Sequence, residues 1–340
     1  MLKKTVDGVG RFSQPSLPNK NKIWTKPFIA AVLVVLVLAV ISLFTGVYDI
    51  SGKEDGWDMF FITRVPRTAA LLLTGAAMAL SGLVMQLITQ NKFVEPTTTG
   101  TTEWAGLGLL FVYILFPSPS LSLRMLGAIV FSFIGTMLFF LFLRRVKLRS
   151  SLIVPIIGLM LGAVISAFST FIGLFFDMSQ NIANWFIGSF APIQAGRYEY
   201  LWLIIIITIL VFLLADRLTI AGLGEDVAKS LGLNYNTIVL IATMLVAVAV
   251  GIVAAVVGNL PFLGLIVPNI ISMMRGDDLR SNLPWVCVLG MGVITLCDII
   301  SRTIISPFEI SVSVILGTVG AVVFIYLLLR NRKPKGARAR

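Results

Sequence analysis

Long apolar runs separated by short polar connections occupy nearly the whole of this 340-residue chain. A helix needs about 20 mostly apolar residues to cross the roughly 30 Å hydrocarbon core of a bilayer. The pattern therefore predicts an all-α, polytopic membrane protein with about ten transmembrane helices. The ten candidate runs lie at residues 27–47, 68–87, 100–116, 125–143, 152–176, 200–214, 235–257, 262–274, 285–300 and 310–329.

The eighth run, Phe262–Met274, is too short for a full crossing. It follows Gly258–Pro261 and contains Pro268, so helical regularity is interrupted twice. Non-helical backbone is tolerated at membrane depth only where protein or a watery cavity shelters its polar groups, and broken helices are common in transporters. Two readings stay open: the run borrows the preceding residues to span, or it is a broken helix buried inside the bundle.

Composition agrees with a membrane protein, since 57% of residues are apolar, 13% are charged and the mean hydropathy is +0.96. The two cysteines, Cys287 and Cys297, lie about 15 Å apart along one predicted helix at 1.5 Å per residue. They cannot pair with each other, and we expect them to pack as apolar residues. Because the chain has no histidine, it lacks the commonest metal ligand. We expect no bound cofactor or metal and no catalytic residues.

Basic residues indicate the orientation through the positive-inside rule. An even number of spans puts both tails on one side, and placing them in the cytoplasm leaves 21 of the 27 Lys and Arg residues inside. The six outside are Lys53, Arg64, Arg67, Arg124, Arg197 and Arg302. The net charge of +11 is thus explained by topology better than by nucleic-acid binding.

The same reading divides the chain into three parts. Residues 1–26 form a basic cytoplasmic tail, residues 27–330 form a single ten-helix transmembrane domain, and residues 331–340 form a second basic cytoplasmic tail. The first apolar run is too long for a removed signal peptide and has no small-residue cleavage site after it. We therefore expect it to be a retained first span.

Three arginines on the outer side are candidates for contact with a partner. Arg64 and Arg67 flank Pro66 where the second span begins, and Pro66 suits the first turn of a helix. Arginine binds carboxylates through two parallel hydrogen bonds, which favours a docking site for acidic residues over interfacial snorkelling. For Arg302, a structural pair with Asp298 at i,i+4 and a docking role are equally compatible with the sequence.

The second span and the loop after it are candidates for the translocation path and its inner gate. Small residues such as Gly82 let membrane helices approach closely, so helix packing accounts for most of the small residues in the second span. Gln86, however, is an amide inside an apolar span, and it must find a partner or line a watery path. After Asn91, Pro96 belongs to a non-helical connection at the cytoplasmic side, a position suited to a gate.

A polar loop between the sixth and seventh runs predicts a contact made in water. We interpret a short charged segment of this loop as a cytoplasmic contact site for a separate ATPase. Its residues are Gly224, Glu225, Asp226, Ala228, Leu231 and Gly232. The chain itself has no Gly-x-x-x-x-Gly-Lys-Ser/Thr loop to bind nucleotide phosphates. Hydrolysis is therefore expected in a partner protein.

Together these motifs resemble the iron-siderophore and vitamin B12 family of ATP-binding-cassette (ABC) importer permeases, the FecCD type, from about residue 27 to 330. Their order and spacing make the combination specific. The matching residues are Arg64-x-Pro66-Arg67, Gly75-Ala76 through Ser81-Gly82 to Gln86, Gly224 to Gly232, Phe262-x-Gly264-Leu265-Ile266-x-Pro268, Gly276-x-Asp278, Asp298 with Arg302, and Pro307-x-Glu309.

The resemblance implies a type II ABC importer permease in a bacterial cell membrane, with ten helices per subunit and a dimer around the path. It also implies two cytoplasmic ATPase subunits and an extracytoplasmic binding protein, either a lipoprotein or periplasmic. By the same resemblance, Arg64, Arg67 and Arg302 receive glutamates of the binding protein, and the loop Gly224–Gly232 fits a groove in the ATPase.

The chain departs from the common family pattern at Asn91-Lys92-Phe93-Val94, at Asn269 after Pro268, and at Gly276–Arg280, which has no histidine. These variants look like a subgroup of ferric-siderophore permeases that often pair with a second, non-identical permease. We expect a ferric siderophore of catecholate or mixed type as the substrate. The alternatives are a haem or cobalamin permease of the same family and a secondary transporter driven by an ion gradient.

Overall fold

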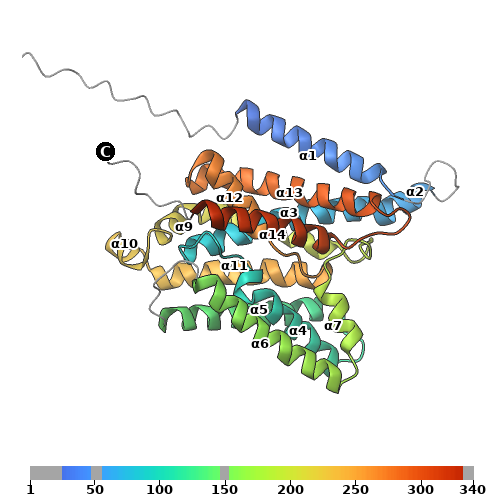
Figure 1. Ribbon diagram of the computed structural model, residues 1–340, viewed down its shortest axis with the longest axis horizontal. Helices are drawn as coiled ribbons and strands as arrows, with labels where there is room; N and C mark the ends of the chain where they lie inside the picture. Colours follow the sequence, from blue (N-terminus) through green and yellow to red (C-terminus); the bar gives the residue numbers. More distant parts are fainter. Residues whose placement is uncertain (1–24, 47–55, 146–152, 332–340) are drawn as a thin grey trace, which may run out of the picture.

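The computed structural model describes residues 25–46, 56–145 and 153–331. The regular structure in these ranges is helical, and no strand occurs in them. The longer helices run along a common direction and form one bundle (Figure 1). The short helices α10 (Glu225–Ser230) and α2 (Gly56–Met59) lie at its opposite ends, and we call these the α10 end and the α2 end.

Along the chain the remaining helices are α1 (Lys26–Phe44), η1 (Phe60–Arg64), α3 (Val65–Ile88), η2 (Thr97–Thr99), α4 (Thr101–Leu115), α5 (Leu121–Arg145), α6 (Ile153–Phe175), α7 (Ser179–Phe186), η3 (Glu199–Trp202), α8 (Leu203–Leu213), α9 (Ala215–Ala221), α11 (Tyr235–Val256), α12 (Leu263–Arg275), α13 (Leu279–Thr303) and α14 (Val312–Asn331). Each of the ten predicted apolar runs overlaps one of the longer helices.

Within the described residues, six helical stretches are long and apolar enough to cross a membrane: Lys26–Phe44, Gly56–Ile88, Leu121–Arg145, Ile153–Phe175, Tyr235–Val256 and Leu279–Thr303. A seventh appears if Glu199–Leu213 and Ala215–Ala221, which meet at an angle of 62°, count as one span. The shorter apolar helices α4, α12 and α14 complete the ten runs. The protein is therefore a multi-pass membrane protein, as predicted.

Helix α3 forms the centre of the bundle. Its apolar stretch is 83% buried, against 22% for α1 and 28% for α6, whose outward side chains are apolar and suit contact with lipid. Glycines make the close packing of α3 possible, because a Cβ on Gly75 would lie 2.6 Å from the carbonyl oxygen of Gly290 and one on Gly82 would lie 1.9 Å from that of Gly264. The expected role of small residues in helix packing is confirmed.

The eighth run is a broken helix buried in the bundle. Residues 258–262 are not helical, Phe262 has a φ of 65°, and α12 occupies only 13 residues with Pro268 inside it. Leu263, Leu265 and the other residues at the start of α12 are buried. Of the two readings, the buried broken helix is the one observed, and its freed backbone groups are sheltered by protein.

The loop between α3 and α4 also enters the bundle. The hydroxyl groups of Thr101, at the start of α4, and Thr136, well inside α5, lie 2.8 Å apart in a hydrogen bond. Helix α4 therefore begins at depth rather than at a surface, and residues 89–100 return into the bundle before it starts. Non-helical segments thus approach α3 and α12 from both ends of the molecule.

Some expectations fall outside the described residues. The proposed tails at 1–26 and 331–340 are described only at their bundle-proximal ends, and Lys53 is not described. Cys287 and Cys297 are described, and both are free and buried on α13. Their expected packing role is confirmed.

Candidate functional site

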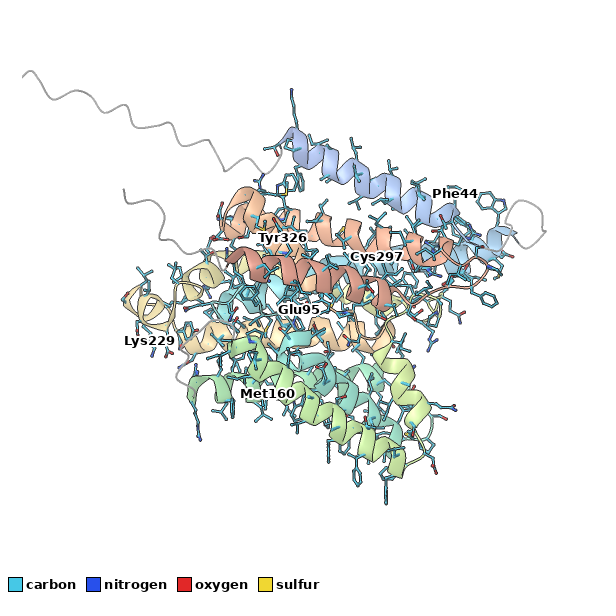
Figure 2. All side chains as sticks on the ribbon, in the orientation of Figure 1. Phe44, Glu95, Met160, Lys229, Cys297 and Tyr326 are labelled. Carbon is cyan, nitrogen blue, oxygen red and sulfur yellow. The ribbon has the colours of Figure 1, made fainter. Side chains whose placement is uncertain are left out.

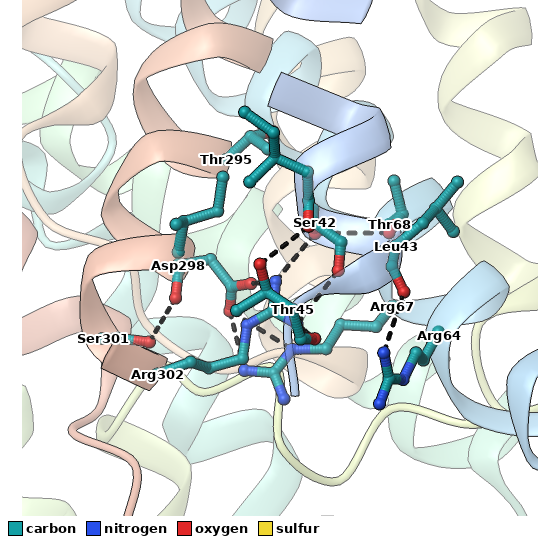
Figure 3. A network of polar contacts seen from close by, with 12 residues as sticks. Ser42, Leu43, Thr45, Arg64, Arg67, Thr68, Thr295, Asp298, Ser301 and Arg302 are labelled. Carbon is teal, nitrogen blue, oxygen red and sulfur yellow. Dashed lines mark hydrogen bonds and ion pairs between the residues drawn. The ribbon is translucent and has the colours of Figure 1, made fainter. Parts of the chain in front are cut away.

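At the α2 end, two arginines from different helices share one buried carboxylate (Figure 3). Asp298 of α13 accepts from Arg67 of α3 at 2.8 Å and forms an ion pair with Arg302 at 2.6 Å. Glu309 adds a second pair, with Arg67 at 2.9 Å. The Asp298 side chain is fully buried and that of Arg67 is 11% exposed. We call Arg67, Asp298, Arg302 and Glu309 the arginine network.

Arg302 ties the arginine network to α1. Its guanidinium donates to the carbonyl oxygens of Ser42 at 3.2 Å and Thr45 at 2.7 Å, and to the Ser42 hydroxyl at 2.8 Å. Its side chain is only 5% exposed. The structural i,i+4 pair with Asp298, which the spacing allowed, is therefore present, and the sequence offered no signal for the contact with Ser42.

Arg64 lies outside the arginine network. It ends η1, is half-buried, and donates to the carbonyl oxygen of Leu43 at 3.2 Å. Figure 3 shows Arg64 and Arg67 on the same helical segment, with Arg67 directed to Asp298. Of the three arginines predicted for docking, Arg67 and Arg302 are brought together, while Arg64 stands beside them with the greatest exposure.

At the α10 end, the predicted polar loop forms the short helix α10, which projects from the bundle (Figure 1). Gly224 and Gly232 bound it with positive φ angles of 109° and 79°, which glycine adopts without strain. Within the helix, Lys229 and Glu225 form an i,i+4 pair at 2.7 Å. The hydrogen bond from Lys229 lowers the pKa of the Glu225 carboxyl.

The surface of α10 is mixed in character. Asp226 is exposed and Ala228 is buried against the bundle, while Val227 and Leu231 expose 43% and 62% of their surfaces. Figure 2 shows Lys229 at the outer edge of this projection. Exposed apolar side chains beside charged ones suit a contact with another protein.

The residues just before α10 contact the end of α3 and the loop that follows it. A Cβ on Gly224 would lie 2.9 Å from the side-chain nitrogen of Gln90, and one on Gly222 would lie 3.1 Å from Leu87. Gln90 is itself in the left-handed region, with a φ of 50°. The first residues of the loop after α3 therefore rest on the residues that precede α10.

The predicted gate residues meet around α12. Gln86 donates to the carbonyl oxygen of Gly264 at 3.3 Å, next to the Gly82 contact. Asn91 is buried and its side-chain oxygen accepts from the backbone of Phe93 at 2.9 Å. Pro96 is buried before η2. Gln86 was expected either to find a hydrogen-bond partner or to line a watery path. It has a backbone partner, and together with Asn91 it also lines a cavity of about 260 Å³.

Lys92, a departure from the family pattern, closes the same cavity from the α10 end. Its ammonium group donates to Asp277 at 3.0 Å and to the Ser272 hydroxyl at 2.9 Å. Its backbone carbonyl accepts from the Asn269 amide at 2.8 Å. The loop after α3 is thus held to the middle of α12 and to its C-terminal end.

Glu95 is a buried residue of this loop that the motif analysis did not single out. Its carboxylate accepts from the backbone N–H of Phe262 at 2.8 Å and from the Thr97 hydroxyl, and the residue is 0% exposed. It lies in the interior between α14 and α11 in the view of Figure 2. Because Phe262 is the break before α12, Glu95 joins the two non-helical segments, and its partner is too distant in sequence to be foreseen.

Comparison with known proteins places these features in a family. A model of the FecCD transport family matches residues 22–330. The chain belongs to this family. It is a permease subunit of an ABC importer, and the loop at α10, the arginines at the α2 end and the broken α12 are its counterparts of the motifs that suggested the resemblance.

Among curated relatives of this FecCD permease, the petrobactin import system permease protein FatD of Bacillus anthracis is 75% identical over 333 residues, covering 98% of this chain and 100% of that protein. The petrobactin import system permease protein YclN of Bacillus subtilis is 41% identical, covering 88% and 97%. The ferric-anguibactin transport system permease protein FatD of Vibrio anguillarum is 36% identical, covering 89% and 98%.

A solved structure supports the fold. An inward-facing conformation of a metal-chelate type ABC transporter aligns with 90% of this chain and 100% of its own, with a TM-score of 0.77 and 28% identity. Membership of the family decides for an ATP-driven importer over a secondary transporter. A secondary transporter would need a carboxylate inside the membrane as its ion site, whereas the buried Asp298 is ion-paired with two arginines.

Proposed function

We propose that this FecCD permease forms the membrane path for a ferric siderophore of catecholate or mixed type, of the petrobactin kind. The single observation behind the substrate is the 75% identity to a petrobactin import permease across 98% of the chain. The two further relatives described above also take their names from siderophore import. This favours a siderophore over haem or cobalamin.

We assign the α10 end to the cytoplasm and the α2 end to the outside of a bacterial cell membrane, with both termini inside. The positive-inside count supports this orientation. Two cytoplasmic ATPase subunits then supply the energy through α10, whose exposed Val227 and Leu231 and charged Asp226 offer a mixed contact surface. Rigid-body motion of this contact opens and closes the path.

The α2 end receives an extracytoplasmic substrate-binding protein. Arg64 is half-buried, and Arg67 is held by Glu309, whose side chain is 29% exposed. Carboxylates of the binding protein can join Arg64 and compete with Glu309 for Arg67. Arg302, at 5% exposure, takes part by holding Asp298 and so the position of Arg67.

The second permease subunit is expected to be non-identical, as the departures at Lys92 and Asn269 suggest by resemblance. Helix α14 exposes apolar side chains such as Val314, Val322 and Ile325, a face that suits either lipid or a partner subunit. No cofactor is proposed for the chain, because the iron that it transports is substrate and stays bound to the siderophore.

The proposal is tested by purifying this chain from detergent-solubilised native membranes and identifying what accompanies it by mass spectrometry. An ATPase, a binding protein and a second permease are expected. The recovered complex is then placed in liposomes, and uptake of ⁵⁵Fe-labelled chelate is measured with active and ATPase-dead partners. Uptake that survives loss of ATPase activity, or recovery of this chain alone under conditions that preserve a known importer, contradicts the proposal.

A further inference from the structure

A second cavity, of about 520 Å³, opens at the α2 end. It lies between the ends of α4, α5 and α11 and the residues before α14. Its polar lining consists of Tyr113, Arg124, Ser189, Arg197, Gly258 and Ser311. None of these residues belongs to the arginine network, so the cavity is a separate feature of the same end.

Two arginines, Arg124 and Arg197, line this cavity, and neither has a carboxylate partner among the described residues. Arg124 donates to the Tyr113 hydroxyl at 2.7 Å, and its central carbon lies 5.6 Å from the Tyr113 ring. Its Nε is buried and makes no hydrogen bond to any described residue. Arg197 is exposed, and in the described ranges its side chain forms no ion pair.

The contrast with the arginine network is informative. In the arginine network, Asp298 and Glu309 neutralise Arg67 and Arg302. In the second cavity, two arginines and several hydroxyl groups form the polar lining. Snorkelling alone extends an arginine from a span end toward lipid headgroups. It does not explain two arginines lining one cavity between helices. A cleft lined by one sign of charge concentrates ligands of the opposite sign.

The lining of the cavity includes the start of a segment that leads toward the gate residues. Gly258, in its lining, begins the non-helical segment that leads to Phe262, where Glu95 and the loop after α3 are bound. One continuous stretch of backbone therefore runs from this hollow at the α2 end to the gate residues. A ligand that entered the cavity would stand at the start of that stretch.

We propose that this cavity is an entry subsite for an anionic metal chelate, with Arg124 and Arg197 binding its carboxylate or catecholate oxygens. Iron(III) held by catecholate and carboxylate groups is net negative, because the charges of its donor oxygens outnumber those of the metal. Guanidinium groups bind such paired oxygens well. The inference rests on the proposed import of a ferric siderophore and adds where this chain first contacts it.

The test uses the complete importer in liposomes with its ATPases and binding protein. Two quantities are measured for each variant: the affinity of the binding protein for the complex, and the maximal uptake of ⁵⁵Fe-chelate at saturating binding protein. Arg197→Gln is the main variant because its side chain is exposed and unbonded in the described structure. Arg197→Lys is the matched control, since it keeps the charge.

We expect Arg197→Gln to lower maximal uptake by about tenfold, as loss of a charged hydrogen bond does, with docking affinity unchanged. Arg197→Lys should recover most of the uptake. Arg124→Gln should act in the same direction and add to the effect. Arg64→Gln should show the opposite pattern, with weaker docking and near-normal uptake once the binding protein saturates.

Maximal uptake within twofold of wild type in Arg197→Gln overturns the subsite. Weaker docking in Arg197→Gln, with uptake restored at saturation, also overturns it, because Arg197 would then contact the binding protein. If Arg124→Gln fails to assemble, Arg197→Gln alone decides. Failure of the proposed function looks different: the wild-type complex would then show no ATP-dependent uptake.

Discussion

The side-chain amide of Asn269 donates a hydrogen bond of 2.8 Å to the backbone carbonyl of Lys92. Both residues depart from the common family pattern, and the structure shows that they contact each other. Asn269 reaches back at the same time to the carbonyl oxygen of Leu265 at 2.7 Å. The two departures are therefore parts of one contact between the loop after α3 and α12.

Replacing Asn269 with leucine should loosen this loop. The change leaves the part-buried carbonyl of Lys92 without its donor, which costs about 1 kcal/mol or more. We expect a lower midpoint of thermal unfolding in detergent. Lys92→Ala is the matched control, because it keeps the backbone carbonyl and removes only the exposed contacts of the ammonium group with Ser272 and Asp277. An exposed ion pair of this kind contributes about 0–1 kcal/mol. Equal losses from the two variants would contradict this assignment.

Asp298→Ala should be among the most destabilising substitutions in the chain. It leaves Arg67 and Arg302 buried without their shared carboxylate, and removal of one partner from a buried ion pair costs about 3–5 kcal/mol. Thermal unfolding of the purified subunit measures the loss. Glu309→Gln is the comparison, since Glu309 is partly exposed and its loss should be much milder. A small shift for Asp298→Ala would show that the arginine network is dispensable for stability.

Charge reversal at Arg64 and Arg67 should weaken docking of the binding protein. The Arg64→Glu and Arg67→Glu double variant replaces two positive charges at this end with negative ones, and we expect affinity to fall by at least about tenfold, more steeply at low salt. Surface plasmon resonance with the importer in nanodiscs gives the affinity, and the amount of subunit in the membrane fraction gives insertion. Unchanged affinity with normal insertion would remove both arginines from the docking surface.

Changes on α10 should separate ATP hydrolysis from transport. Replacing Glu225, Asp226 and Leu231 with alanine removes the charged and exposed apolar side chains while leaving buried Ala228 in place. We expect ATPase activity that no longer responds to the loaded binding protein, together with uptake reduced by about tenfold or more. Both are measured in the same liposomes. Normal assembly with coupled uptake would show that the ATPase contacts another part of the chain.

Enlarging Gly82 should force α3 and α12 apart. A methyl group there would lie 1.9 Å from the carbonyl oxygen of Gly264, a distance that only a backbone shift can relieve. We expect Gly82→Ala to lower stability by about 1–3 kcal/mol and to impair uptake. Gly317→Ala on α14 is the matched control, because its added carbon would meet nothing closer than 3.9 Å. Wild-type behaviour of Gly82→Ala would mean that the two helices separate easily.

Local pattern was sufficient for much of the fold. Run length located all ten apolar helices, glycine and proline placed the break before α12, and the i,i+4 spacing allowed the pair of Asp298 and Arg302. These features depend on residues near one another in the chain. Gly224 and Gly232 likewise mark in the sequence the segment that forms α10.

Contacts across the bundle could not be predicted in the same way. Glu95 and Phe262 are 167 positions apart, and Arg302 and Ser42 are 260 apart. Each of these polar residues looks ordinary in its own segment, and its partner depends on how distant helices pack. The cavity at Arg124 and Arg197 is of this kind too, because Arg124 comes from the start of α5 and Arg197 from the connection between α7 and η3.

The contact of Gly224 with Gln90 has a consequence for timing. The Gln90 side chain lies against Gly224 and the Leu87 side chain lies against Gly222, so a displacement of the residues before α10 is passed directly to the end of α3 and the loop after it. Movement of the ATPases and movement of the gate should then occur in phase, with no long-lived state in which one has switched and the other has not. Simultaneous fluorescence labels on α10 and on that loop would be expected to report a single relaxation time.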